Sequence, residues 1–128
     1  MGELKIEPTG AALGAFVTGI DLTRPLSAAD AAALRAAAVK HKVVFLPDQH
    51  ITLDDLERVT DALGGRTETP FVKPLDGRPM VIRVLKEPQS KIGFGEAWHT
   101  DLSYLPAPPA FTCLWSNEIP PKGGDTMW

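Results

Sequence analysis

Residues 96–101 read Glu96-Ala97-Trp98-His99-Thr100-Asp101, and this stretch carries the most specific signal in the chain. We expect residues 98–104 to form a strand, on which side chains two positions apart point to the same face. His99 and Asp101 would then present an imidazole and a carboxylate side by side. The pattern predicts two neighbouring donors for one metal ion.

A second histidine would complete the 2-His-1-carboxylate triad of non-haem Fe(II) oxygenases, which leaves coordination positions open. A His-x-Asp triplet alone is a weak signal, because a strand-edge histidine hydrogen-bonded to a neighbouring aspartate is the commoner arrangement. The assignment of His99 and Asp101 as metal ligands therefore depends on the sequence around them.

The sequence on both sides of the triplet is typical of short strands and loops. Downstream, proline and glycine clusters at residues 106–109, 120–121 and 123–124 separate short apolar runs, and we expect a strand over residues 111–115. Upstream, residues 87–96 form a polar loop that is longer than most connections, and such loops tend to be functional or mobile.

The first half of the chain predicts mixed α/β structure. Ser27 and Asp30 form a capping pattern before an alanine-rich run, and Thr52 and Asp55 form a second one. Apolar residues at helical spacing follow each pattern, whereas other segments alternate or are continuously apolar. We expect helices over residues 28–40 and 52–63 and strands over residues 15–20, 43–46 and 80–85.

Composition limits the classes of protein that the chain can belong to. It has 128 residues, 13 basic and 16 acidic side chains with a net charge of −3, and one cysteine, which suits one globular domain. The acidic balance predicts no nucleic-acid partner, and no apolar run approaches the roughly 20 residues of a membrane helix. Cys113 alternates with Phe111 and Trp115, so we interpret it as a small buried apolar residue that forms no internal disulfide. We expect a soluble, cytoplasmic protein.

Several linked motifs resemble the taurine dioxygenase (TauD/TfdA-like) family of Fe(II)- and 2-oxoglutarate-dependent dioxygenases. The downstream motifs are WHTD at residues 98–101, PP at 108–109 and 120–121, GGDT at 123–126, and Trp128. The upstream motifs are GAFVTGIDL at residues 14–22, RPL at 24–26, and VVFL at 43–46 followed by Asp48-Gln49. Because these motifs occur in the family's order over nearly the whole chain, they are far more specific than one triplet.

The resemblance implies an α+β fold, namely the N-terminal part of a double-stranded β-helix, or jelly roll, with flanking helices. The barrel would be incomplete in this chain, which we interpret as a single, C-terminally truncated domain. We divide it into an N-terminal α/β part at residues 1–86, an active-site loop at 87–97, and the first jelly-roll strands with the metal motif at 98–128.

The resemblance also implies roles for individual residues. His99 and Asp101 match the first two Fe(II) ligands, and Thr126 matches the hydroxyl that holds a carboxylate of the cosubstrate 2-oxoglutarate. A hydroxyl donor suits an anionic oxygen, although Thr126 without the family context would be an ordinary strand residue. Trp98 and Trp128 would pack around the site, and O2 would be the second cosubstrate.

Two groups that the family's site requires have no match in this chain. The triad needs a second histidine and the cosubstrate site needs an arginine, both later than position 128. The other two histidines are His41, which follows a helix, and His50, which lies in a polar turn, and we interpret both as capping or exposed residues. We therefore expect the chain to be the N-terminal part of a dioxygenase.

Three hypotheses for function follow. The first is an oxidoreductase that hydroxylates a small organic substrate while 2-oxoglutarate is decarboxylated to succinate and CO2. The second is a non-catalytic truncated fragment of such an enzyme, which would bind metal weakly. The third is a jelly-roll binding or isomerase domain that uses the same pair with zinc, and the GGDT motif at its family spacing disfavours it.

The substrate is less well defined than the reaction. Taurine-specific members carry a histidine after the second helix and an asparagine before the metal motif, where this chain has residues 67–71 (TETPF) and 93–96 (GFGE). Taurine is therefore disfavoured, and sulfonates, sulfate esters and small carboxylates stay open. Scattered cations (Lys73, Arg83, Lys86 and Lys91) would favour an anionic small molecule, and the full-length protein could form a homo-oligomer.

Overall fold

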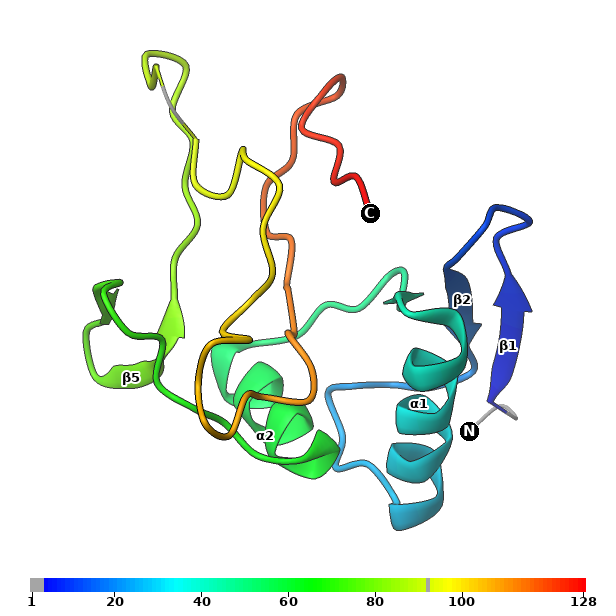
Figure 1. Cartoon of the computed structure of the whole chain (residues 1–128). Helices are drawn as coiled ribbons and strands as arrows, with labels where there is room; N and C mark the ends of the chain where they lie inside the picture. The colour runs from blue at the N-terminus through cyan, green and yellow to red at the C-terminus, as the bar shows by residue number, and fades with distance from the viewer. Residues whose placement is uncertain (1–3, 92) are drawn as a thin grey trace.

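The architecture is that of a computed structural model, which describes residues 4–91 and 93–128. Its helices and strands lie in the first two thirds of the chain, and the described residues after position 82 form neither (Figure 1). The elements in chain order are β1 (Lys5–Pro8), β2 (Ala15–Thr18), α1 (Ala28–His41), β3 (Val44–Phe45), α2 (Leu53–Leu63), β4 (Pro74–Leu75) and β5 (Arg78–Ile82).

Strand β2 is the centre of a three-stranded sheet, with β1 antiparallel on one side and β3 parallel on the other. Its side chains alternate as a half-buried strand requires: Ala15 and Val17 are fully buried, whereas Phe16 is 45% exposed and lies beside the Phe45 ring of β3. Strands β4 and β5 form a separate antiparallel hairpin. The strand predicted over residues 15–20 is thus confirmed in its first four positions.

Both predicted helices are confirmed, together with their starts. The Ser27 hydroxyl accepts a hydrogen bond from the Asp30 backbone N–H (3.0 Å), and α1 buries Ala31, Leu34 and Ala37 on one face. Thr52 and Asp55 form a complete capping box at the start of α2. Within residues 4–91 and 93–128, no helix has the length and apolarity that a membrane crossing requires.

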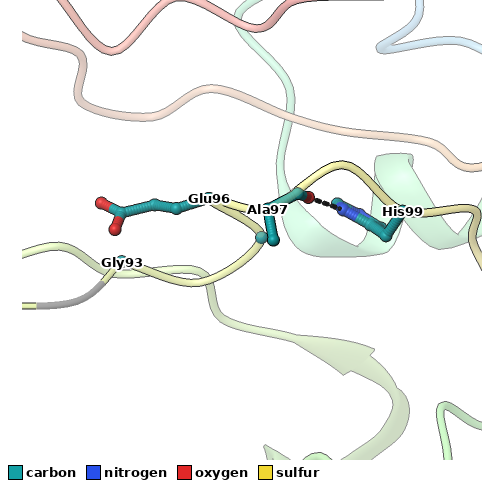
Figure 2. Close-up of a pocket in the computed structure, with 5 residues that line it drawn as sticks. Gly93, Glu96, Ala97 and His99 are labelled. Carbon is teal, nitrogen blue, oxygen red and sulfur yellow. Dashed lines mark hydrogen bonds between the residues drawn. The ribbon is translucent and has the colours of Figure 1, made fainter.

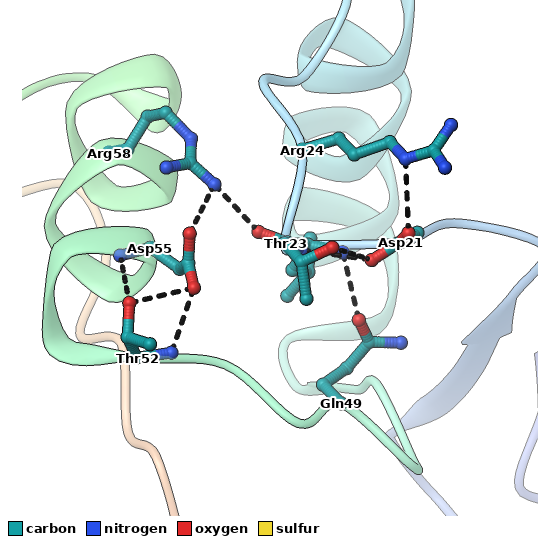
Figure 3. A network of polar contacts seen from close by, with 8 residues as sticks. Asp21, Thr23, Arg24, Gln49, Thr52, Asp55 and Arg58 are labelled. Atoms are coloured by element: carbon teal, nitrogen blue, oxygen red, sulfur yellow. Dashed lines mark hydrogen bonds and ion pairs between the residues drawn. The ribbon is translucent and has the colours of Figure 1, made fainter.

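An apolar cluster joins the C-terminal segment to the N-terminal half. Leu22, Ile51 and Val59 are its buried members, and Trp115 packs against them from far along the chain. Polar contacts brace the same region (Figure 3): Arg58 Nη2 lies 2.6 Å from Asp55 Oδ1 and donates to the Leu22 carbonyl at 3.1 Å. Gln49 Oε1 accepts from the Leu22 N–H at 2.9 Å.

The strand predicted over residues 98–104 is wrong, because the chain turns within it. Leu102 has a positive φ of 49°, and the Leu105 N–H donates to the Leu102 carbonyl across the turn. The hydroxyls of Thr100 and Ser103 form a hydrogen bond of 2.6 Å in the same turn. These local hydrogen bonds replace the pairing with another chain segment that a strand needs.

The strand predicted over residues 111–115 is also absent, although its alternation in burial is present. Phe111, Cys113 and Trp115 are half-buried, whereas Thr112 and Leu114 are exposed. The segment has the expected inward and outward faces but no neighbouring strand to pair with among the described residues. Cys113 is accordingly half-buried, not buried as predicted.

Two further strands differ in extent from the prediction. The run at residues 43–46 is reduced to β3, which pairs with β2 at only two positions. The strand predicted over residues 80–85 lies earlier, as β5, because its partner β4 and the turn at Asp76-Gly77 fix the register. No jelly-roll barrel is closed within the described residues.

Candidate metal centre

The structure brings His99 and Asp101 together, although the segment that carries them is not a strand. His99 Nε2 lies 3.3 Å from Asp101 Oδ1, and each side chain is about half exposed. The chain runs from β5 into the long polar loop, and the two residues follow that loop. The predicted proximity therefore holds without the predicted strand.

The ring nitrogen of His99 that does not face Asp101 is hydrogen-bonded to the backbone (Figure 2). His99 Nδ1 lies 2.6 Å from the Ala97 carbonyl oxygen, which can only accept a hydrogen bond. Nδ1 therefore carries the hydrogen, and in the neutral ring Nε2 presents its lone pair toward Asp101. Metal-bound histidines commonly have this arrangement, in which the second nitrogen donates to a carbonyl.

The carboxylate oxygen of Asp101 that does not face His99 also has a hydrogen-bond partner. The Thr112 hydroxyl donates to Asp101 Oδ2 at 2.9 Å, which leaves Oδ1 turned toward His99. Thr112 was not identified from the sequence. Its signal was the alternation of residues 111–115, which places it on the outward face between Phe111 and Cys113.

The pair fits a divalent metal ion by its geometry and its donor chemistry. Two atoms that bind one ion at right angles, each about 2.1 Å away, stand about 3 Å apart, close to the observed spacing. A neutral imidazole nitrogen and a carboxylate oxygen facing each other repel unless a cation or a proton lies between them. Imidazole and carboxylate together suit Fe(II), Mn(II) and Zn(II).

The pair has no third protein donor in the described part of the chain, where no group of three or more His, Cys, Asp or Glu side chains could hold a metal. His41 ends α1, and its carbonyl accepts a hydrogen bond from the Gly14 N–H at 2.8 Å. His50 is exposed in the turn before α2. His50 is thus exposed as predicted, whereas His41 lies half-buried in the last turn of α1, where Lys42 is the C-cap residue.

An open hollow of about 490 Å³ adjoins the histidine and is lined by Gly93, Gly95, Glu96, Ala97 and His99. Gly95 has a φ of 74°, and a Cβ atom there would stand 3.3 Å from Cε1 of His99, so glycine lets the ring lie close to the loop. The Glu96 side chain points away from His99 (Figure 2) and pairs with Lys86. The hydrogen bond from Lys86 and that from the Gly93 backbone lower the pKa of the Glu96 carboxyl.

The remaining predicted site residues lie apart from the pair. Thr126 is exposed and does not line the hollow, and within the described chain no hydrogen bond joins it to His99 or Asp101. Trp98 is 76% exposed and Trp128 is 68% exposed, so the packing expected of them around the site is not seen. The structure thus assembles the two predicted metal ligands but not the predicted cosubstrate contact.

Comparison with known proteins places the chain in a family. The sequence model of the taurine catabolism dioxygenase TauD, TfdA family matches residues 5–128. The chain is 32% identical over 127 residues to an α-ketoglutarate-dependent sulfate ester dioxygenase from Pseudomonas putida, covering 98% of this chain and 41% of that protein. It is also 32% identical over 137 residues to an (S)-phenoxypropionate/α-ketoglutarate dioxygenase from Delftia acidovorans, covering 98% and 46%.

A solved structure agrees with these similarities. A taurine dioxygenase from Burkholderia xenovorans superposes with a TM-score of 0.55 at 32% identity, over 59% of this chain and 28% of that one. The chain spans less than half the length of these relatives. With a family match over nearly all of its residues, the chain belongs to the taurine catabolism dioxygenase TauD, TfdA family.

Proposed function

We propose that the full-length protein is an Fe(II)- and 2-oxoglutarate-dependent dioxygenase that hydroxylates a small anionic organic substrate. The observation that carries this proposal is the His99–Asp101 pair, whose facing atoms lie 3.3 Å apart while the opposite atom of each side chain is hydrogen-bonded. The names of the similar proteins support the cosubstrate, because α-ketoglutarate is another name for 2-oxoglutarate.

In this proposal His99 would hold Fe(II) through Nε2, and Asp101 would hold it through Oδ1. Bound Fe(II), with 2-oxoglutarate and O2, would supply the oxidising chemistry that hydroxylates the substrate and yields succinate and CO2. The Ala97 carbonyl keeps the hydrogen on Nδ1, so that Nε2 stays a donor to the metal. Thr126 would donate its hydroxyl to a carboxylate of 2-oxoglutarate.

The second histidine and the cosubstrate arginine would come from sequence equivalent to the remaining part of the longer relatives. Neither His41 nor His50 is placed to supply the histidine, because one ends α1 and the other is exposed before α2. The chain covers 41% of the sulfate ester dioxygenase, so more than half of that protein has no counterpart here.

For the substrate we favour a sulfate ester or a small organic carboxylate over taurine. Two similar proteins act, by their names, on a sulfate ester and on phenoxypropionate. The positions that distinguish taurine-specific members carry other residues in this chain. The hollow beside His99 is open, and Lys86 pairs with Glu96, one of the residues that line it.

The alternative is a non-catalytic fragment that binds metal weakly. One observation favours it: the described residues contain no third donor near the pair. Two donors leave most of the coordination sphere to water, so affinity would be low.

Succinate formation by the full-length protein distinguishes the two. The protein would be supplied with Fe(II), 2-oxoglutarate and O2, and tested with an alkyl sulfate ester, an aryloxy carboxylate and taurine. We expect substrate-dependent succinate with one of the first two. His99→Ala and Asp101→Ala should abolish it, whereas His50→Ala, which changes an exposed histidine, should leave it intact. Turnover retained in either ligand variant would overturn the assignment.

A further inference from the structure

Thr112 contacts one of the two candidate ligands without being in a position to bind the metal itself. Its hydroxyl donates to Asp101 Oδ2 at 2.9 Å, across ten intervening residues, and Asp101 Oδ1 then faces His99 Nε2. A carboxylate can rotate about its Cβ–Cγ bond and present either oxygen. A hydrogen bond to one oxygen fixes that rotation and assigns the other oxygen to the metal side.

The segment that carries Thr112 is anchored on both sides of it. The Arg35 guanidinium of α1 lies 5.2 Å from the centre of the Phe111 ring and also donates to the Leu63 carbonyl at the end of α2. Three residues after Thr112, Trp115 packs against the apolar cluster of Leu22, Ile51 and Val59. The inward side chains of this segment thus attach it to both helices, and the alternation turns Thr112 outward.

The two segments joined by this hydrogen bond come from opposite sides of the turn at residues 102–105. Figure 1 shows the yellow segment with His99 and the orange segment after it running beside each other near α2. Asp101 belongs to the less anchored segment, since its neighbours Trp98 and Tyr104 are 76% and 64% exposed. Thr112 is therefore the link through which the packed part of the molecule orients the carboxylate.

We propose that Thr112 is a positioning residue, which orients Asp101 so that Oδ1 stands beside His99 Nε2 for a shared metal ion. The inference rests on the proposed function, because it assumes that Asp101 is a ligand. Removal of such supporting contacts lowers metal affinity about 10- to 100-fold in known sites. Because this hydrogen bond is exposed to water, we expect an effect near the lower end of that range.

The test compares side chains of nearly equal shape in the full-length protein. Thr112→Val removes the hydroxyl and keeps the branched side chain, and Thr112→Ser keeps the hydroxyl. Mn(II) is the probe, because it takes the same nitrogen and oxygen donors and its binding can be followed without turnover. We expect Thr112→Val to weaken Mn(II) binding about tenfold, and Thr112→Ser to bind as the unchanged protein does.

A matched control separates positioning from the general loss of a hydroxyl. Thr23 donates its hydroxyl to Asp21 Oδ1 at 2.6 Å, also on the surface but in the loop before α1. Thr23→Val should leave Mn(II) binding unchanged. Thermal unfolding midpoints of all variants show whether they fold. If Thr112→Val does not fold, Thr112→Ala supplies a second variant without the hydroxyl.

The outcomes distinguish this proposal from the function on which it rests. If the unchanged protein binds Mn(II) in a manner that Asp101→Ala abolishes, yet Thr112→Val and Thr112→Ala bind equally well, the role of Thr112 is overturned and the ligand pair stands. Equal weakening by Thr112→Ser and Thr112→Val would also overturn it. If the unchanged protein binds no Mn(II), or Asp101→Ala binds as well as the unchanged protein, both the ligand assignment and the role of Thr112 fail.

Discussion

His99 Nε2 and Asp101 Oδ1 lie 3.3 Å apart on a segment that has no strand partner among the described residues. Their proximity arises from three local contacts: the Ala97 carbonyl holds the imidazole, Thr112 holds the carboxylate, and the turn after Asp101 reverses the chain. The predicted pair of donors is therefore assembled by hydrogen bonds within its own segment and from the segment after the turn, without the sheet that the sequence suggested.

Gly95→Ala tests how closely the loop must approach the histidine. The added methyl group would stand 3.3 Å from His99 Cε1, and the φ of 74° would be strained for alanine. We expect weaker metal binding and a loss of about 1 to 2 kcal/mol in the free energy of unfolding. Gly10→Ala is the control, since Gly10 has a φ of 83° but no neighbour within 4 Å.

Gly10→Ala should show the backbone strain alone, with unchanged metal binding. Isothermal titration with Mn(II) and urea unfolding measure the two effects separately. Equal metal affinity in both glycine variants would show that the approach of the loop to His99 does not matter for the site.

Thr52→Ala tests the capping box at the start of α2. The Thr52 hydroxyl accepts a hydrogen bond from the Asp55 N–H, and its own N–H donates to Asp55 Oδ2. We expect a loss of about 1 kcal/mol in the free energy of unfolding, measured with urea. Thr60→Ala, in the same helix, removes a methyl group and a hydroxyl that donates to the Leu56 carbonyl but caps no helix end, and should cost less than about 0.5 kcal/mol. Equal losses would contradict a specific capping role.

The lowered pKa of the Asp55 carboxyl predicts that the stability of the protein depends on pH. Hydrogen bonds from the Thr52 backbone and hydroxyl, and then Arg58, lower the pKa of this carboxyl below its ordinary value of 3.8. A carboxyl whose pKa is lower in the folded state contributes stability that is present above the unfolded pKa and lost as the pH falls through the folded pKa. Asp55→Asn should therefore be less stable than the unchanged protein at neutral pH, and the difference should shrink below pH 3.8. A difference that stayed constant down to pH 2 would contradict this.

Leu34→Ala tests the packing of α1 on the body that anchors the site. Leu34 is 3% exposed, and the loss of such a side chain costs about 2 to 5 kcal/mol. Val39, in the same helix, is 62% exposed, so Val39→Ala should change the free energy of unfolding by less than about 0.5 kcal/mol. Similar urea midpoints for the two variants would show that α1 is not packed as described.

The parts of the fold that depend on local sequence could be predicted. Ser27 and Thr52 mark helix starts because their side chains satisfy backbone groups a few residues away, and the structure bears out both. The strands at residues 98–104 and 111–115 could not be predicted in the same way. A strand needs a partner, and neither the turn at Leu102 nor the absence of a neighbouring strand follows from alternation.

The candidate site shows the same division. The spacing of His99 and Asp101 predicted their proximity, although through a strand that residues 98–104 do not form, and the family resemblance suggested Fe(II). The contact from Thr112 depends on which oxygen of Asp101 faces a segment eleven positions later, and no spacing rule encodes that. The role of Thr126 stays a prediction, because the described structure does not bring it to the pair.

The central claim is that His99 and Asp101 bind one metal ion. The most direct test is the amount of Fe(II) retained, without oxygen and with 2-oxoglutarate present, by the full-length protein and by its His99→Ala, Asp101→Ala and His50→Ala variants. We predict one Fe(II) per chain in the unchanged protein and in His50→Ala, and its loss in both ligand variants. Retention of one equivalent by His99→Ala or Asp101→Ala would contradict the account.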